Sequence, residues 1–161
     1  MKILGIDPGI QNLGVALLEN GILRTAVEHR PRGRTLALRL LDLQRFLEEI
    51  VEAWHPEMAA LEQVIYHRNV RAALTLGAAR GVALVLLARH GIPIHELPPA
   101  RVKQAITGNG RASKAQVRYM VQRLAAHPEP LGEHAADAAA CALALQQTLR
   151  HAVPSSRTRR R

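Results

Sequence analysis

Two carboxylates lie in apolar segments that are expected to be interior strands. Asp7 ends the segment 3–7, ILGID, and Glu62 lies within the segment 58–65, MAALEQVI. A charge in such a position is unfavourable unless it is paired or bound to a metal, and neighbouring carboxylates raise each other's pKa values. A divalent cation such as Mg²⁺, which prefers oxygen ligands, removes both difficulties. Asp7 and Glu62 are therefore candidate metal ligands.

A second pair of polar residues opens the last apolar segment. His134 and Asp137 are three residues apart and share one face of a predicted helix, and three alanines follow Asp137. Taken alone, Asp137 is a charge that stabilises the helix N-terminus, and His134 is a surface or capping residue. Taken with Asp7 and Glu62, they favour one shared site. The third aspartate, Asp42, lies on the polar side of another predicted helix and is expected to be solvated.

The elements that must position these residues follow from hydropathy and turn signals. An antiparallel meander with a hairpin at Asn20-Gly21 is predicted over three segments: 3–7, 13–18 and 22–28. Helices and strands then alternate: helix 35–54, strand 58–65, helix 70–89, strand 92–97, and helices 98–107, 113–126 and 133–150. This order predicts an α/β fold of ribonuclease-H-like architecture. Its five-stranded mixed sheet has three antiparallel strands, then two parallel ones, with helices on both faces.

The predicted helix 70–89 is apolar around nearly its whole circumference, interrupted only by Arg71, Arg80 and Arg89. A helix of this kind must be buried on all sides. One side can lie on the sheet, whereas the other needs cover. Either the remaining helices supply it, or the same helix of a second copy does so across a two-fold axis. We favour the homodimer.

Length and charge restrict the class of protein. The 161 residues, 48% of them hydrophobic, fit one globular domain, predicted over 1–152 and followed by a flexible basic tail at 153–161. The chain has 22 Lys and Arg against 13 Asp and Glu, and it stays positive without the four arginines of its last five residues. This excess suggests a polyanionic partner such as nucleic acid. An Arg-rich soluble surface would give the same composition.

Other compositional features exclude several classes of protein. The single cysteine, Cys141, excludes an internal disulfide and a cysteine-based zinc site. No apolar run approaches the roughly 18 residues of a membrane span, and the first apolar stretch is too short for a signal peptide. We therefore expect a cytoplasmic protein without a membrane partner.

A set of short motifs, in order over residues 1–146, resembles the RuvC family of Holliday-junction resolvases. The GIDPG motif alone would be weak, but the ordered set is specific. The motifs are ILGIDPG at 3–9 with Gly14, ALEQV at 60–64, Asn69 with LGAARG at 76–81, RVKQ at 101–104, GNG at 108–110, KAQV at 114–117 and HAADA at 134–138.

The resemblance implies a metal-dependent endonuclease. The four catalytic, metal-binding positions of the family match Asp7, Glu62, His134 and Asp137, and the resemblance implies two Mg²⁺ or Mn²⁺ ions per subunit. The ions would activate a water and stabilise the leaving 3′ oxygen, giving 5′-phosphate and 3′-hydroxyl products. Many members have Asp where this chain has His134. A nitrogen ligand there would favour Mn²⁺, and His134 could instead orient the water or contact the phosphate.

The resemblance also points to DNA contacts. Lys103 and Lys114 match family positions, and a base-probing side chain is expected just after the Glu-Gln pair, where Ile65 and Tyr66 stand. Tyr66 has the stacking face. Charge and position add three arginines, each of which could equally be a solvated surface charge. The predicted DNA contacts are thus Ile65, Tyr66, Arg68, Asn69, Lys103, Arg111, Lys114 and Arg118.

The expected partners are a four-way DNA junction, a second copy of the chain, and a branch-migration complex of the RuvA and RuvB type. Two alternatives remain. One is another ribonuclease-H-like nuclease that acts on RNA or on replication intermediates, and the other is a junction-binding dimer that does not cut. A sugar-kinase or actin-like ATPase shares the opening motif, but it needs a second domain that 161 residues do not provide.

Overall fold

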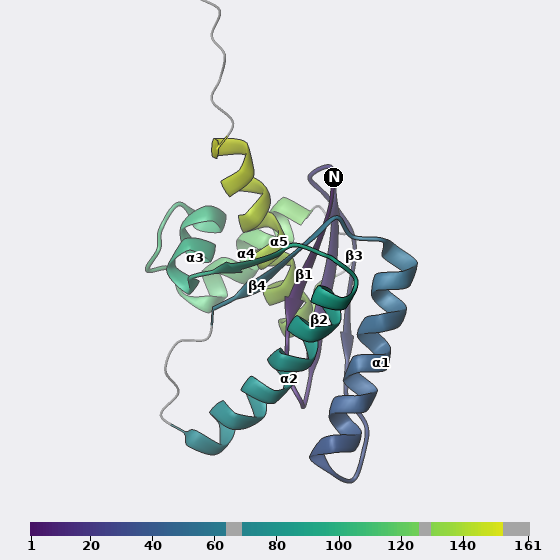
Figure 1. The fold of residues 1–161 in the computed structure, drawn as a ribbon. Helices are drawn as coiled ribbons and strands as arrows, with labels where there is room; N and C mark the ends of the chain where they lie inside the picture. Colours follow the sequence, from purple (N-terminus) through teal and green to yellow (C-terminus); the bar gives the residue numbers. More distant parts are fainter. Residues whose placement is uncertain (64–68, 126–129, 153–161) are drawn as a thin grey trace, which may run out of the picture.

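A five-stranded mixed sheet forms the centre of the computed structural model (Figure 1), and the strand order is β3-β2-β1-β4-β5. The structure describes residues 1–63, 69–125 and 130–152. The strands are β1 (Lys2–Asp7), β2 (Leu13–Glu19), β3 (Ile22–His29), β4 (Met58–Glu62) and β5 (Ile94–Leu97). β1, β2 and β3 pair antiparallel, whereas β4 lies parallel to both β1 and β5. The predicted fold class is therefore confirmed.

Helices cover both faces of this sheet. In the described part of the chain they are α1 (Leu36–Trp54), α2 (Val70–Arg89), α3 (Pro99–Thr107), α4 (Lys114–Ala125) and α5 (Glu133–Ala152). α1 and α2 share one hydrophobic core with the sheet, and α3, α4 and α5 share the core of the opposite face (Figure 1). β1 serves both cores because successive strand residues point to opposite faces: Ile3 packs on one side and Leu4 on the other.

The α5 backbone lies unusually close to the sheet at two glycines. A Cβ on Gly5 would stand 1.9 Å from the Ala138 carbonyl oxygen, and a Cβ on Gly14 would stand 2.0 Å from that of His134. Only glycine admits a helix this close. The alanines of α5 complete the contact, and they bring the first turns of α5 against the end of β1.

Two strand boundaries differ from prediction by two residues or more, whereas the other strands differ by one residue at one end. The strand predicted over 58–65 ends at Glu62, and residues 64–65 lie outside the described part. The strand predicted over 92–97 begins at Ile94, because the Ile92 amide bonds the Leu87 carbonyl at the end of α2 and Pro93 has no amide hydrogen. The hairpin at Asn20-Gly21 is confirmed, with φ angles of 51° and 90°.

Of the two predicted ways of covering the helix at 70–89, cover by the remaining helices of the same chain is wrong for the described residues. Only Ala79, Ala83, Leu86 and Leu87 of α2 are buried, whereas three large aliphatic side chains are 63–70% exposed: Val70, Leu74 and Val85. The described helices therefore leave one side of α2 uncovered.

Among the described helices, α2 alone is long and apolar enough to cross a membrane by length and hydropathy. The sequence reasoning did not identify it as such a segment. Arg80 in its middle is ion-paired with Glu96 of β5 at 2.6 Å, and the inner side of α2 packs on the sheet. These contacts hold the inner side of α2 against the sheet.

Asp42 is not simply solvated, contrary to expectation. It accepts a hydrogen bond from the Arg32 amide at 2.9 Å and another from His29 Nε2 at 2.7 Å. The Arg32 amide, followed by His29, lowers the pKa of Asp42. The His29 ring also stacks on Phe46, with the centroids 4.2 Å apart. Asp42 therefore ties β3 to α1.

Candidate active site

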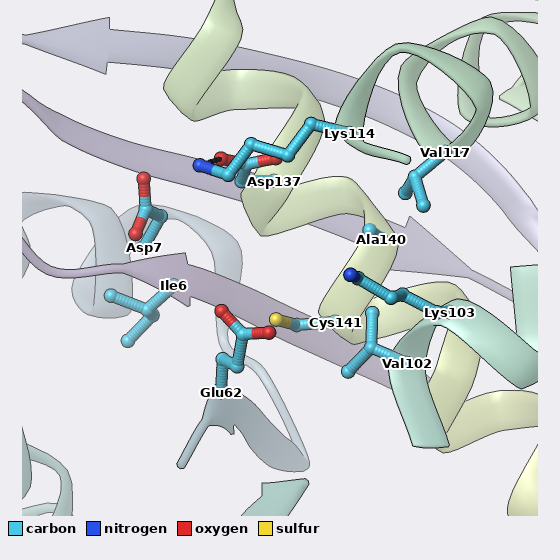
Figure 2. Close-up of a pocket in the computed structure, with 10 residues that line it drawn as sticks. All are labelled: Ile6, Asp7, Glu62, Val102, Lys103, Lys114, Val117, Asp137, Ala140 and Cys141. Atoms are coloured by element: carbon cyan, nitrogen blue, oxygen red, sulfur yellow. Dashed lines mark ion pairs between the residues drawn. The ribbon is translucent and has the colours of Figure 1, made fainter. Parts of the chain in front are cut away.

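Three carboxylates from distant parts of the sequence line one small pocket (Figure 2). Asp7 ends β1 and Glu62 ends β4, and these parallel neighbours bring their carboxyl ends to the same edge of the sheet. Asp137 comes from the second turn of α5, which the close approach at Gly14 holds against that edge. The predicted convergence of these three side chains is thus present in the fold.

The electrostatics of the pocket show negative charges that are incompletely compensated. Burial raises the pKa of Glu62, and the charges of Asp137 and Asp7 raise it further. Burial and then Asp7 likewise raise the pKa of Asp137, whereas Lys114 and Arg118 oppose the shift. Mutual repulsion of this kind is expected where carboxylates are gathered to bind a cation.

Two basic side chains contact these carboxylates in the chain itself. His134 Nδ1 lies 2.7 Å from Asp7 Oδ2, so the fourth predicted ligand does join the group, through Asp7. Lys114 Nζ lies 3.8 Å from Asp137 Oδ2 (Figure 2). The ammonium group of Lys114 partly neutralises the carboxylates, and the His134 ring is hydrogen-bonded to Asp7.

The donor chemistry fits a divalent cation, although the ligand atoms are not drawn together. Among the described residues, no three His, Cys, Asp or Glu side chains are close enough to hold a metal ion as they stand. Carboxylate oxygens are nevertheless the donors that Mg²⁺ and Mn²⁺ prefer. Burial first, and then the charge of Asp7 and, for Glu62, of Asp137, raise the pKa values of these carboxyl groups. The donor types at the pocket therefore fit a divalent cation.

The α5 N-terminus is fixed by a residue that sequence reasoning missed. Glu28 of β3 accepts hydrogen bonds through Oε1 from the amides of His134 at 2.8 Å and Ala135 at 3.1 Å. A carboxylate at this position satisfies amides that lack helical partners and complements the helix dipole. Strand alternation alone could not find it, because the partner amides lie more than 100 residues away.

The predicted DNA contacts fall into several groups. Lys103 and Lys114 line the pocket. Arg118 lies beside the site, ion-paired with Glu133. Asn69 caps α2, since its side chain accepts from the Ala72 amide at 3.1 Å.

The other predicted DNA contacts either lie away from the pocket or fall on residues outside the described part of the chain. Arg111 belongs to the loop before α4, where its amide donates to Asn109 Oδ1, and it does not line the pocket. Three predicted contacts lie outside the described residues: Ile65, Tyr66 and Arg68. Cys141 lines the pocket, but burial raises the pKa of its thiol, so it stays neutral.

Comparison with known proteins agrees with this geometry. The family model described as "Crossover junction endodeoxyribonuclease RuvC" matches residues 3–145. A protein of that name from Halorhodospira halophila is 44% identical over 146 residues, covering 88% of this chain and 87% of the relative. Another from Chloroflexus aurantiacus is 44% identical over 151 residues, covering 89% and 91%.

Solved structures show the same likeness. The structure described as "Thermus thermophilus RuvC structure" is 30% identical with a TM-score of 0.84, covering 94% of this chain and 97% of that one. A second, described as "T. thermophilus RuvC in complex with Holliday junction substrate", has a TM-score of 0.87 at 30% identity, covering 94% and 96%. On this evidence the chain belongs to the RuvC family of crossover junction endodeoxyribonucleases.

Proposed function

We propose that this protein is a structure-selective endonuclease that resolves Holliday junctions in DNA recombination and repair. It cuts two opposed strands symmetrically and leaves 5′-phosphate and 3′-hydroxyl ends. The observation that carries the proposal is the convergence of Asp7, Glu62 and Asp137 in one pocket, in a chain of a junction endonuclease family. A similar solved structure is described as a complex with a Holliday junction.

The carboxylates Asp7, Glu62 and Asp137, with His134, would hold divalent cations, two Mg²⁺ or Mn²⁺ per subunit. When bound, such ions supply Lewis acidity at the phosphate and lower the pKa of a coordinated water. Asp7 is central to the site because it contacts His134 and acts on the pKa of both other carboxylates. The imidazole of His134 favours Mn²⁺ if it becomes a ligand.

The basic residues of the pocket hold the substrate. Lys103 and Lys114 line it beside the carboxylates, so their ammonium groups bind the phosphates next to the scissile bond. Such contacts position the strand without reading its sequence. Should His134 not bind metal, its ring beside Asp7 orients the attacking water or contacts the phosphate.

A two-fold symmetric junction needs two matched cuts, and a homodimer supplies two sites. The uncovered side of α2, with Val70, Leu74 and Val85 exposed, supports a dimer through this helix. We further propose a single nuclease domain over 1–152 with a basic tail at 153–161, and a cytoplasmic protein that works with a branch-migration complex of the RuvA and RuvB type.

A cleavage panel tests this function. A synthetic mobile four-way junction, a linear duplex, a replication fork and an RNA–DNA hybrid are each incubated with the protein and Mg²⁺ or Mn²⁺. We expect paired nicks at symmetric positions in the junction, no cleavage in EDTA, and little cleavage of the other substrates. Preferential cleavage of the hybrid or the fork would favour another ribonuclease-H-like activity. Junction binding without cleavage in either metal would favour the non-catalytic dimer.

A further inference from the structure

A second, basic cavity lies at the same edge of the sheet as the carboxylates. It has a volume of about 440 Å³, and Ile10 and Gln11 contribute to its wall. These residues belong to the loop that follows Asp7 and leads into β2. The rest of the wall comes from the first turns of α1 and α2 and the loop before α1. The cavity therefore lies on the α1/α2 side of the β1–β2 loop, whereas Asp137 approaches from the α5 side.

Three arginines give this cavity its charge. Arg34, Arg39 and Arg71 line it, and no Asp or Glu is among the described residues that line it. The side chains of Arg34 and Arg71 are exposed and have no hydrogen bond or ion pair with the described residues, although the Arg71 carbonyl accepts from Thr75 Oγ1. Arg39 uses only Nε, which donates to the Gly33 carbonyl at 3.1 Å. The guanidinium groups are thus available to a ligand.

The helix ends increase the positive potential. α1 and α2 both begin at this cavity, with Thr35 and Asn69 as their N-caps. A helix N-terminus carries partial positive charge, and acidic residues usually complement it. Neither helix has an acidic residue in its first turn, and Arg71 lies in that of α2. Arginines at this place are unfavourable without an anion.

We propose that the cavity of Arg34, Arg39 and Arg71 binds backbone phosphates of the DNA substrate, on the far side of the β1–β2 loop from the scissile bond. This inference rests on the proposed function, because the anion is the junction DNA itself. Each strand of a duplex carries one phosphate per about 3.4 Å of axis, so DNA held at the carboxylates has further phosphates to offer beyond the loop. One guanidinium group can donate two parallel hydrogen bonds to two oxygens of the same phosphate, so arginine side chains are well matched to a phosphate ligand.

The test measures junction binding against salt concentration. R34Q, R39Q, R71Q and the triple variant are compared with wild type by fluorescence anisotropy on a labelled four-way junction. R45Q is the matched control, because Arg45 is exposed on the same helix as Arg39 but does not line the cavity. R39K keeps the charge and is expected to restore most of the binding lost in R39Q.

The slope of log affinity against log salt is negative, and each arginine removed should reduce its magnitude by about one. The loss of affinity between 50 and 200 mM salt then shrinks by roughly threefold per arginine. R45Q should match wild type. If the triple variant unfolds, as circular dichroism would show, R34Q and R71Q carry the test, since neither side chain has an intramolecular partner among the described residues.

The outcomes separate the two proposals. A wild-type protein that binds the junction, together with a triple variant of unchanged affinity and salt slope, overturns the phosphate cavity and leaves the proposed function standing. A wild-type protein that shows no salt-dependent junction binding overturns the proposed function, and this inference with it. Reduced affinity and slope in the arginine variants, but not in R45Q, supports both.

Discussion

The two longest helices, α2 and α5, have 20 residues each and are both apolar, yet they are used differently. In α5 every residue from Ala138 to Leu145 is buried within the chain. In α2 four residues are buried, while Leu74 and Val85 are 70% and 63% exposed. Composition alone would predict that both helices are buried in the hydrophobic core. The difference lies in side-chain size and in what faces them.

Small side chains on α5 face glycines on the sheet, which lets the backbones approach closely and fixes the position of Asp137. Large aliphatic side chains on α2 project away from the sheet, where the described chain offers nothing to cover them. α5 therefore builds the site within one chain, whereas α2 leaves an apolar side exposed, which we propose is covered by a second copy.

The largest effect should come from the close contact of α5. Gly14→Ala places a Cβ against the backbone of His134, and backbone cannot move aside as a flexible side chain does. We expect a loss of more than about 3 kcal/mol in the free energy of unfolding, measured by urea denaturation. Gly77→Ala on α2 is the control, because its Cβ would meet nothing within 4 Å. Helix propensity should make that variant as stable as wild type or more so. Equal stability of the two variants would contradict the close packing of α5.

A large part of this architecture was predictable from sequence. Strand alternation, the Asn20-Gly21 hairpin and the helical periods gave the sheet order and the helices. Asp7 and Glu62 could be identified as site candidates because a carboxylate in an apolar strand is unfavourable unless it is paired or bound to a metal.

What could not be predicted depends on contacts between distant segments. The bond from Glu28 to the start of α5, the Asp42–His29 contact and the Arg118–Glu133 ion pair join residues that no local pattern connects. Hydropathy likewise showed that α2 is apolar, but not which side the chain would leave open.

The next largest effect should come from substitutions on the exposed side of α2, and it concerns association of the chain more than its stability. The double variant Leu74→Gln, Val85→Gln changes exposed side chains, so the stability of a single chain should change by less than about 0.5 kcal/mol per substitution. The same change should shift the protein from dimer to monomer in sedimentation velocity, because it places polar groups in the interface that we propose. A wild-type protein that sediments as a monomer at every concentration would contradict the assigned role of α2.

A smaller effect is expected at the start of α5. Glu28→Ala removes the acceptor of the His134 and Ala135 amides, which should cost about 0.5–2 kcal/mol, as for other helix caps. Junction cleavage should fall as well, because the first turn carries His134. Glu19→Ala, which breaks only the exposed pair with Arg24, serves as control and should cost less than about 1 kcal/mol. Equal losses in both variants would show that the cap does not hold the site.

The smallest effect concerns pH. The pKa values of Glu62 and Asp137 are raised in the folded chain, so both groups keep their protons to higher pH than they do when unfolded. Their repulsion is therefore absent at acid pH and develops as pH rises from the ordinary values of 4.5 and 3.8 towards the raised ones. In EDTA, Asp137→Asn should be more stable than wild type at pH 7, and this difference should disappear in acid. A variant less stable than wild type at pH 7 would contradict the stated electrostatics.

The central claim is that Asp7 and its neighbouring carboxylates cut DNA and are not needed to bind it. The most direct measurement compares wild type with Asp7→Asn on one labelled four-way junction, scoring affinity and cleavage in the same Mn²⁺ buffer. The account predicts that Asp7→Asn binds as tightly as wild type, or more tightly because a negative charge is removed, and produces no nicks. Nicking by Asp7→Asn at the wild-type rate would contradict it.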